Sequence, residues 1–223
     1  TTAGTAAEVT INYVITDAEK NRKMVCVDVH DIPVVAVVDP DMMATMPKGL
    51  TAATGMDALT HAIEGYITKG AWELSDMFHL KAIEIIARSL RGACENTKEG
   101  RLDMALGQYV AGMGFSNVGL GIVHSMAHKT GAAFSTGHIT HGCANAMYLP
   151  YVIKYNARDA VAAHRYAEIA RRMGLAGTSE QALINSLCEK IDAFNVQMNI
   201  PKSLKEFGII EDEFKENNKS SYF

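Results

Sequence analysis

The sequence has 223 residues, of which 48% are hydrophobic and 21% are charged, and its formal net charge is -4. A chain of this length can bury one substantial core or two small ones, and the composition is that of an ordinary globular protein. Because the net charge is small and negative, and Lys and Arg are scattered along the chain, neither nucleic acid nor an anionic membrane is expected as a partner.

The cysteines are Cys26, Cys94, Cys143 and Cys188, and no two of them form a CxxC pair. This wide spacing argues against a thiolate zinc site and against a disulfide framework, so a reducing, cytoplasmic location is expected. We find neither a signal peptide nor an apolar run long enough to span a bilayer. The sequence begins at Thr1 without an initiator Met, and we therefore expect it to be a segment of a longer protein.

The first part of the chain has the pattern of β-structure. Residues 9–15 are rich in β-branched and aromatic side chains, and residues 23–27 follow a polar turn as a second strand that can pair with the first. Residues 34–38 are a continuous apolar run that ends just before Pro40, as expected of a strand buried on both faces.

After Pro40 the pattern becomes helical, with apolar residues recurring every three or four positions. Gly174 is placed to cap one helix, and Pro201 is placed to stop another. We therefore expect a mainly α fold in which a β-rich segment, residues 1–40, precedes an all-α domain, residues 41–223. The predicted helices cover residues 42–68, 73–91, 101–117, 121–134, 142–155, 157–173 and 179–198.

Half of the histidines fall in one short segment, at His124, His128, His138 and His141. His124 and His128 are four residues apart, so a helix places both on one face. A single pair of this kind is more often two hydrogen-bonded histidines than a metal site. The cluster as a whole still requires an explanation.

A second pair, Asp57 and His61, has the same helical spacing. The residues around both pairs are small or apolar, and a carboxylate or an imidazole on such a buried face is costly unless it is paired or bound to a metal. Asp57 and His61 could simply be hydrogen-bonded to each other. Taken together, however, the pairs and a further loop histidine can supply an Asp/His₃ site, which suits Fe²⁺, Zn²⁺, Co²⁺ or Mn²⁺.

Four motifs then occur in order along the chain: TTAGT at residues 1–5, ATGMDALTH at residues 53–61, the His124/His128 pair, and HGCANA at residues 141–146. This series resembles the successive signatures of the iron-containing alcohol dehydrogenase family. Further stretches, at residues 6–13 and 107–117, resemble the lactaldehyde reductase branch of that family. The resemblance extends to about residue 212 and is much more specific than any one motif.

The resemblance implies a metal site with four protein ligands, which correspond to Asp57, His61, His124 and His141. The implied ion is Fe²⁺, with Zn²⁺ as an alternative. The last ligand stays open, because the family usually places it ten residues after the position of His128. That residue is His138 here, whereas the motif that follows His141 favours His141.

The resemblance also implies a coenzyme site. His128 matches a catalytic histidine that lies beside the nicotinamide and the substrate in the family. Thr1, Thr2 and Thr5 match a threonine-rich turn that contacts the dinucleotide, and Lys23 matches a lysine near the ribose. The implied coenzyme is NAD(H), and the phosphorylated form NADP(H) stays open.

A domain organisation and an activity follow from the same resemblance. Residues 1–40 would be the C-terminal remnant of an α/β dinucleotide-binding domain whose glycine-rich pyrophosphate loop is absent, and residues 41–223 the all-α iron-binding catalytic domain. The implied activity is metal-dependent, NAD(H)-linked interconversion of a short-chain aldehyde and a primary alcohol, as with lactaldehyde and 1,2-propanediol. The partners would be small molecules, and the full-length protein a homodimer or higher oligomer.

Two other interpretations stay open. The chain could be a butanol or 1,3-propanediol dehydrogenase with the same chemistry and a different pocket, or a truncated, catalytically inactive metal-binding domain. Among the remaining residues, His79 and His164 lie on amphipathic helices and are expected to be partly exposed. Cys143 matches no ligand of the family and is interpreted as a buried thiol.

Overall fold

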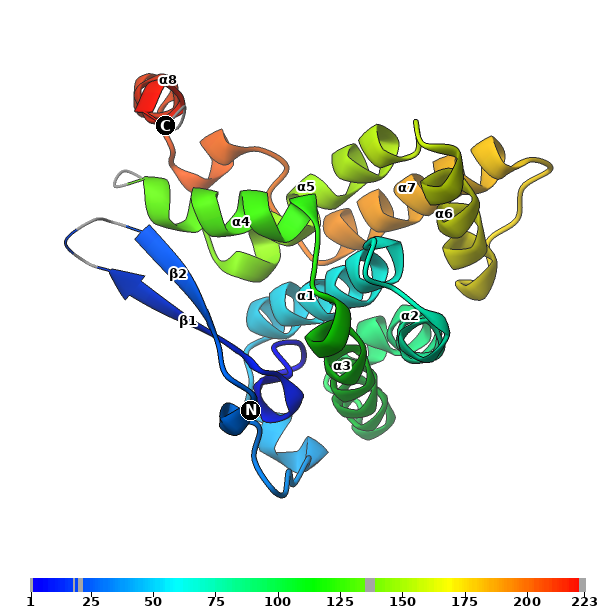
Figure 1. The fold of residues 1–223 in the computed structure, drawn as a ribbon. Helices are drawn as coiled ribbons and strands as arrows, with labels where there is room; N and C mark the ends of the chain where they lie inside the picture. Colours follow the sequence, from blue (N-terminus) through cyan, green and yellow to red (C-terminus); the bar gives the residue numbers. More distant parts are fainter. Residues whose placement is uncertain (1, 18, 20–21, 135–138, 221–223) are drawn as a thin grey trace.

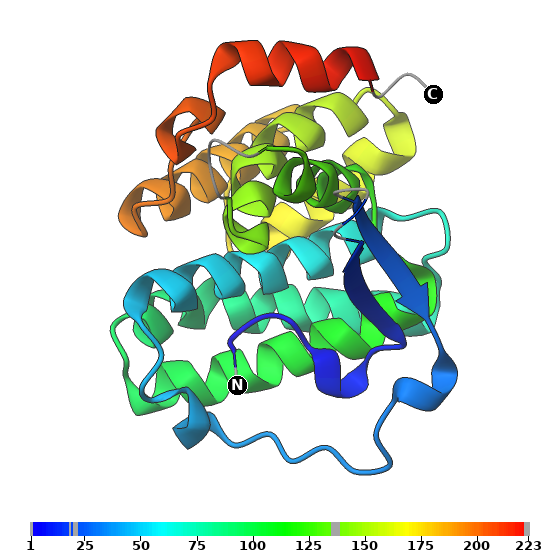
Figure 2. The ribbon, with the colours of Figure 1, turned by 90° about the vertical axis from the view of Figure 1, so that its left-hand side faces the viewer.

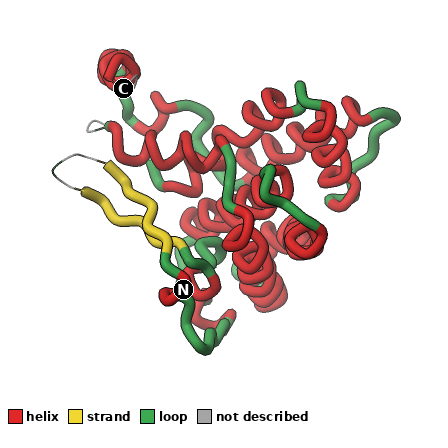
Figure 3. The backbone as a smooth tube through the Cα atoms, viewed as in Figure 1, coloured by secondary structure: helices red, strands yellow, loops and turns green. Residues whose placement is uncertain are grey.

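The computed structural model describes residues 2–17, 19, 22–134 and 139–220. Most of these residues are helical, and an antiparallel hairpin lies near the N-terminus (Figure 1, Figure 3). The mainly α fold predicted from the sequence is therefore confirmed. No helix among these residues combines the length and the apolar character that crossing a membrane requires.

The predicted helices lie close to their expected positions, apart from the start of the first, and α8 is not among the predicted ranges. The helix predicted at residues 42–68 begins only at Lys48, because Pro40–Met43 forms a short 3₁₀ turn and Pro47 directly precedes the helix. Gly174 ends α6 with a positive φ of 73°, which glycine adopts without strain. The helices are α1 (Lys48–Ile67), α2 (Glu73–Cys94), α3 (Lys98–Val118), α4 (Ile122–Ala133), α5 (His141–Asn156), α6 (Ala160–Arg172), α7 (Glu180–Gln197) and α8 (Glu211–Ser220).

The predicted hairpin is confirmed. Strand β1 (Asn12–Asp17) pairs antiparallel with β2 (Arg22–Val27), with Tyr13 opposite Cys26. The hairpin extends away from the helices α1 to α3 (Figure 1). Its large apolar side chains stay accessible, since Val14 is 45% exposed and Val25 is 54% exposed.

The prediction of a strand at residues 34–38 is wrong. This segment has no regular secondary structure, and the side chains of Val34 and Val37 are almost fully exposed. Within the described part of the chain, the sheet consists of β1 and β2 alone. A buried strand needs neighbours that satisfy its backbone and cover its faces, and here the apolar run has neither.

Helix α1 is the central element of the core. Figure 2 shows α1 between two layers, with α2 and α3 on one side and α4 and α5 on the other. Its side chains are buried along most of its length, including the fully buried Met56, Leu59 and Ile63. Any polar side chain in the middle of α1 is therefore shielded from water and must find its partners inside the protein.

The prediction that His79 is partly exposed is wrong. Its exposed fraction is 0%, because α2 is covered by both α1 and α3 at this point. Gly65 and Gly114 make room for the ring, since a Cβ atom on either residue would lie within 2.4 Å of His79 Nε2. His164 is exposed as predicted, and its Nδ1 contacts Glu180.

Candidate metal centre

Asp57 lies in the middle of α1, and its exposed fraction is only 5%. Its Oδ1 lies 3.6 Å from Nε2 of His124 and 3.6 Å from Nε2 of His141. His61, one turn further along α1, has its Nε2 3.9 Å from the same oxygen. The structure thus brings all four predicted metal ligands around one carboxylate oxygen, although α4 and α5 are distant from α1 in the sequence.

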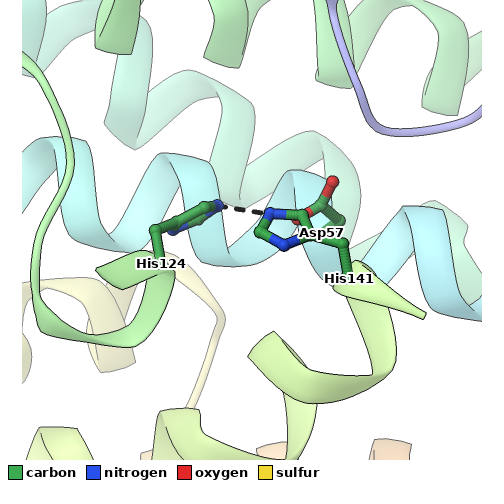
Figure 4. A group of neighbouring side chains, drawn as sticks. All are labelled: Asp57, His124 and His141. Atoms are coloured by element: carbon green, nitrogen blue, oxygen red, sulfur yellow. Dashed lines mark ion pairs between the residues drawn. The ribbon is translucent and has the colours of Figure 1, made fainter. Parts of the chain in front are cut away.

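The tightest part of this group is Asp57, His124 and His141, which point toward one another from α1, α4 and the first residue of α5 (Figure 4). One ligand atom from each lies within 4.8 Å of the others. This separation leaves room for one ion among a carboxylate oxygen and two imidazole nitrogens. Such an oxygen and nitrogen set is chemically suited to Fe²⁺ or Zn²⁺.

A glycine sets the approach of α5 to α1. A Cβ atom on Gly142 would lie 2.1 Å from the backbone oxygen of Ala53, so only glycine fits here without a shift of one helix. His141 directly precedes Gly142 at the start of α5. The close contact of the two helices therefore determines how near His141 lies to Asp57.

The rings of three residues form a stack beside Asp57. The ring of His61 lies between that of Phe115, at 4.3 Å, and that of His124, at 4.5 Å, with interplanar angles of 19° and 18°. Phe115 belongs to α3, so the stack connects α3, α1 and α4. This packing limits the rotation of both imidazoles and holds them in a defined orientation.

The electrostatics of the group favour cation binding. Burial by itself raises the pKa of Asp57, but the surrounding histidines outweigh it and hold this pKa well below its usual range. Burial lowers the pKa of His61 to about 3, against the opposing effect of Asp57. Asp57 is thus a carboxylate and His61 a neutral imidazole, which are the protonation states that metal ligands need.

His124 differs, because two carboxylates act on it. Burial alone would lower its pKa, but the hydrogen bonds and charges of Asp57 and Glu64 raise it above its ordinary value. A metal that binds Nε2 therefore takes the place of a proton that the carboxylates otherwise stabilise.

His128 lies next to this group rather than inside it. Its ring centroid is 4.6 Å from that of His141 and 6.5 Å from that of His124. The residue follows His124 by one turn of α4 and is half-buried. This position lets its ring approach a small molecule bound at the centre.

Two buried polar residues of the site were not predicted from the sequence. Asn145 lies four residues after His141, and its Nδ2 donates a hydrogen bond of 2.6 Å to Asp57 Oδ1. Glu64 lies three residues after His61 and contacts His124. Their helical spacing from predicted ligands is the signal that could have found them.

Asn145 also provides a test of whether the site suits a cation. Its Nδ2, a donor with partial positive charge, lies 3.1 Å from Nε2 of His124 and 3.2 Å from Nε2 of His141. The lone pairs of these nitrogens and the Asp57 oxygen therefore converge on one point. Its buried Oδ1 has no hydrogen-bond partner among the described residues. The residues present fit a metal ion.

The predicted coenzyme residues are only partly described. Thr2 and Thr5 form a turn in which their Oγ1 atoms are 3.1 Å apart, and Ala3 N donates to Oγ1 of Thr54 on α1. This turn packs against α1, since a Cβ on Gly4 would overlap the backbone oxygen of Thr54.

Thr1 and His138 lie outside the described residues. Lys23 lies in β2 opposite Thr16, and its side chain is outside what the structure describes. Cys143 is only partly buried, in contrast to the buried thiol predicted.

Comparison with protein families defines the class. Residues 51–222 match the C-terminal domain of the Fe-containing alcohol dehydrogenase family, and residues 1–40 match iron-containing alcohol dehydrogenase. Since the first match alone covers most of the sequence, the chain belongs to the iron-containing alcohol dehydrogenase family.

Individual relatives agree with this assignment. The chain is 58% identical to lactaldehyde reductase of Escherichia coli strain K12 over 215 residues, which cover 96% of this chain and 55% of the relative. It is 50% identical to the NADPH-dependent butanol dehydrogenase of Clostridium saccharobutylicum over 214 residues, covering 96% of this chain and 54% of the relative. The crystal structure of a 1,3-propanediol oxidoreductase superposes with a TM-score of 0.89 at 39% identity, covering 98% of this chain and 57% of that one. The chain therefore spans about half the length of the curated relatives it matches.

Proposed function

We propose that this chain is the metal-binding, catalytic part of an oxidoreductase that interconverts a short-chain aldehyde and a primary alcohol. The observation that carries the proposal is the convergence of His61, His124 and His141 on the carboxylate of Asp57. The substrate pair is of the lactaldehyde and 1,2-propanediol type, in keeping with the 58% identity to lactaldehyde reductase. The coenzyme is NAD(H), with NADP(H) as the alternative that the name of the butanol dehydrogenase relative suggests.

In this proposal Asp57, His61, His124 and His141 hold the ion, Fe²⁺ in the first place and Zn²⁺ as the alternative. A divalent ion at this site supplies Lewis-acid chemistry toward the oxygen of an alcohol or aldehyde. The nicotinamide supplies the hydride chemistry. Nearly complete burial of Asp57 and His124 excludes water and strengthens the electrostatic interactions among these groups.

His128 is proposed as the catalytic residue that exchanges a proton between the substrate oxygen and solvent. Its half-buried ring lies beside His141, so it can reach both the centre and its surroundings. Thr1, Thr2, Thr5 and Lys23 are proposed to contact the dinucleotide. Residues 1–40 and 41–223 are proposed to belong to different domains. The full-length protein is proposed to be cytoplasmic and homo-oligomeric.

A second candidate is a metal-binding domain without catalytic activity. The specific observation in its favour is that the four proposed metal ligands all lie on α1, α4 and α5, so they come together without the residues proposed to contact the dinucleotide. The two candidates agree on the metal and differ on turnover and coenzyme binding.

One experiment tests both candidates. The chain is purified without metal, loaded anaerobically with Fe²⁺ or with Zn²⁺, and assayed for bound metal, NADH and NADPH binding, and lactaldehyde reduction. We expect one metal ion per chain in wild type and its loss in Asp57→Asn, which keeps the shape but removes the charge. Metal with turnover supports the oxidoreductase, and metal without coenzyme binding supports the second candidate. Equal metal content in wild type and Asp57→Asn would contradict both.

A further inference from the structure

Glu64 is a buried carboxylate that the proposed chemistry does not yet use. It lies on α1 at helical spacing from the two ligands of that helix, seven residues after Asp57 and three after His61. Its exposed fraction is 5%. A carboxylate so deep in an apolar core is costly unless its oxygens accept several hydrogen bonds.

The partners of Glu64 are all on the first turn of α4. Oε1 accepts a hydrogen bond from the backbone N–H of Val123 at 2.8 Å. Oε2 accepts from the backbone N–H groups of His124 at 3.1 Å and Gly121 at 3.2 Å. Helix α4 has no side-chain cap of its own at Gly121. The carboxylate from α1 therefore fills the capping position of α4, where its charge is also favoured by the helix dipole.

The same carboxylate binds the side chain of His124. The distance from Oε2 to Nδ1 of His124 is 2.7 Å, and both side chains are buried. Both oxygens of Glu64 already accept hydrogen bonds from backbone N–H groups, those of Gly121, Val123 and His124. Because these oxygens act as acceptors, the ring nitrogen that faces them is the donor, and Nδ1 of His124 carries a proton. Nε2, on the opposite side of the ring, is the nitrogen that faces Asp57 and that a metal ion would bind.

Space for this contact depends on a glycine. A Cβ atom on Gly121 would lie 2.7 Å from Oε1 of Glu64. Because the opposing atom is the end of a flexible side chain, such a Cβ would displace the carboxylate rather than the backbone. Gly121 thus permits the close approach of Glu64 to the first turn of α4.

We propose that Glu64 is a positioning residue for the metal centre, which fixes the tautomer and ring orientation of His124 and at the same time anchors the first turn of α4 to α1. Outer carboxylates of this kind raise the basicity of a ligating imidazole and hold its orientation. The anchor also sets the position of His128, one turn further along α4. This inference rests on the metal site in the proposed function.

The alternative role for Glu64 is that of a helix cap alone. A cap stabilises the fold but has no separate effect on the metal, so its loss would lower stability and leave metal affinity and the His124 proton unchanged. The two roles therefore differ in measurements made on folded protein.

The test compares the full chain with Glu64→Gln, which keeps the side-chain shape and removes the charge. Affinity for Co²⁺ and Zn²⁺ is measured by chelator competition on protein shown to be folded by circular dichroism. We expect affinity to fall by about 10- to 100-fold, the usual effect of losing such an outer carboxylate. In the Zn²⁺-loaded protein, the proton resonance of His124 Nδ1 should move upfield, because its acceptor is no longer charged.

Two further variants complete the design. Gly121→Ala displaces the carboxylate without removing its charge and should weaken metal binding in the same direction, so the test does not depend on Glu64→Gln alone. Glu84→Gln changes the net charge equally on the surface of α2, where Glu84 contacts Lys81, and should leave metal affinity unchanged.

The outcomes separate the two proposals. If wild type binds metal and both Glu64→Gln and Gly121→Ala bind it equally well with an unchanged Nδ1 resonance, the role of Glu64 is disproved while the metal site stands. If wild type binds neither ion, the metal site and the role of Glu64 are both overturned. Weaker binding and a shifted resonance in folded variants support the positioning role.

Discussion

The side-chain amide of Asn145 donates a hydrogen bond of 2.6 Å to Asp57 Oδ1 at the point where the histidine nitrogens of the site converge. This amide donates the hydrogen bond that Asp57 Oδ1 accepts, in addition to the histidines that lower the pKa of Asp57. An ion bound at the same point would itself compensate the charge of Asp57. The contribution of Asn145 to stability should therefore depend on whether metal is present.

We predict that Asn145→Ala destabilises the metal-free chain more than the metal-bound chain. Leaving a buried acceptor without its donor costs about 1–3 kcal/mol, and a bound ion removes most of that cost. Urea unfolding with excess chelator and with saturating Zn²⁺ measures the difference. The control is Asn195→Ala, since Asn195 is also buried and donates to the backbone oxygen of Ala146 away from Asp57. Equal losses for Asn145→Ala in both conditions would contradict the prediction.

The glycine between α5 and α1 gives a second prediction. Gly142→Ala places a Cβ 2.1 Å from the backbone oxygen of Ala53, so the helices must separate and His141 must move from Asp57. We expect a loss of about 1–3 kcal/mol in the free energy of unfolding and a weaker metal affinity. Gly49→Ala is the control, because a Cβ there meets nothing within 4 Å. Metal affinity unchanged in folded Gly142→Ala would show that this contact does not position His141.

The burial of His79 predicts that the free energy of unfolding depends on pH. Burial lowers its pKa from 6.5 in the unfolded chain to about 4 in the folded protein. Between these two values the unfolded chain binds a proton at His79 that the folded chain does not, so stability falls as the pH falls through this window. The loss reaches about 3 kcal/mol at most below the window.

The matching experiment replaces the titrating group. His79→Gln should show a smaller loss of stability than wild type between pH 7.5 and pH 4, by an amount of about 1–3 kcal/mol. Both proteins are unfolded with urea in the presence of chelator, so that protonation of the metal ligands contributes equally. Parallel pH curves for the two proteins would mean that His79 keeps its ordinary pKa in the folded state.

Substitutions of His128 and His124 are predicted to have different effects on metal binding and on catalysis. His128→Ala should retain metal, because its ring lies outside the tight group of ligands, whereas His124→Ala should lose it. If full-length protein turns over lactaldehyde, His128→Ala should lower kcat and alter its pH–rate profile, since a proton-transfer group contributes about 10²- to 10⁴-fold. Metal content and steady-state kinetics are measured on the same preparations. An unchanged pH–rate profile would remove His128 from proton transfer.

Local spacing made much of the centre predictable. Asp57 with His61, and His124 with His128, are pairs four residues apart, and a helix alone determines that each pair shares a face. Apolar periodicity likewise located the helices, because burial of one face repeats every three or four residues. The hairpin was predictable for the corresponding reason, since its strands are adjacent in the sequence.

Features that depend on distant packing were not predictable. Glu64 finds its partners on α4, about sixty residues later in the chain, so its role appears only once α1 and α4 are packed. His79 was predicted to be exposed because periodicity does not show that two further helices cover α2. The apolar run at residues 34–38 was predicted as a strand, but a strand forms only beside a partner.

Because α1 lies between two layers of helices, the loss of iron should affect local unfolding differently on its two sides. The proposed ligands tie α1 to α4 and α5, while α1 contacts α2 and α3 mainly through packed side chains, including the stack of Phe115 on His61. Metal should therefore slow amide hydrogen exchange in α4 and α5 far more than in α2 and α3. Local unfolding of α2 and α3 would then be limited by apolar packing, and local unfolding of α4 and α5 by the amount of bound metal.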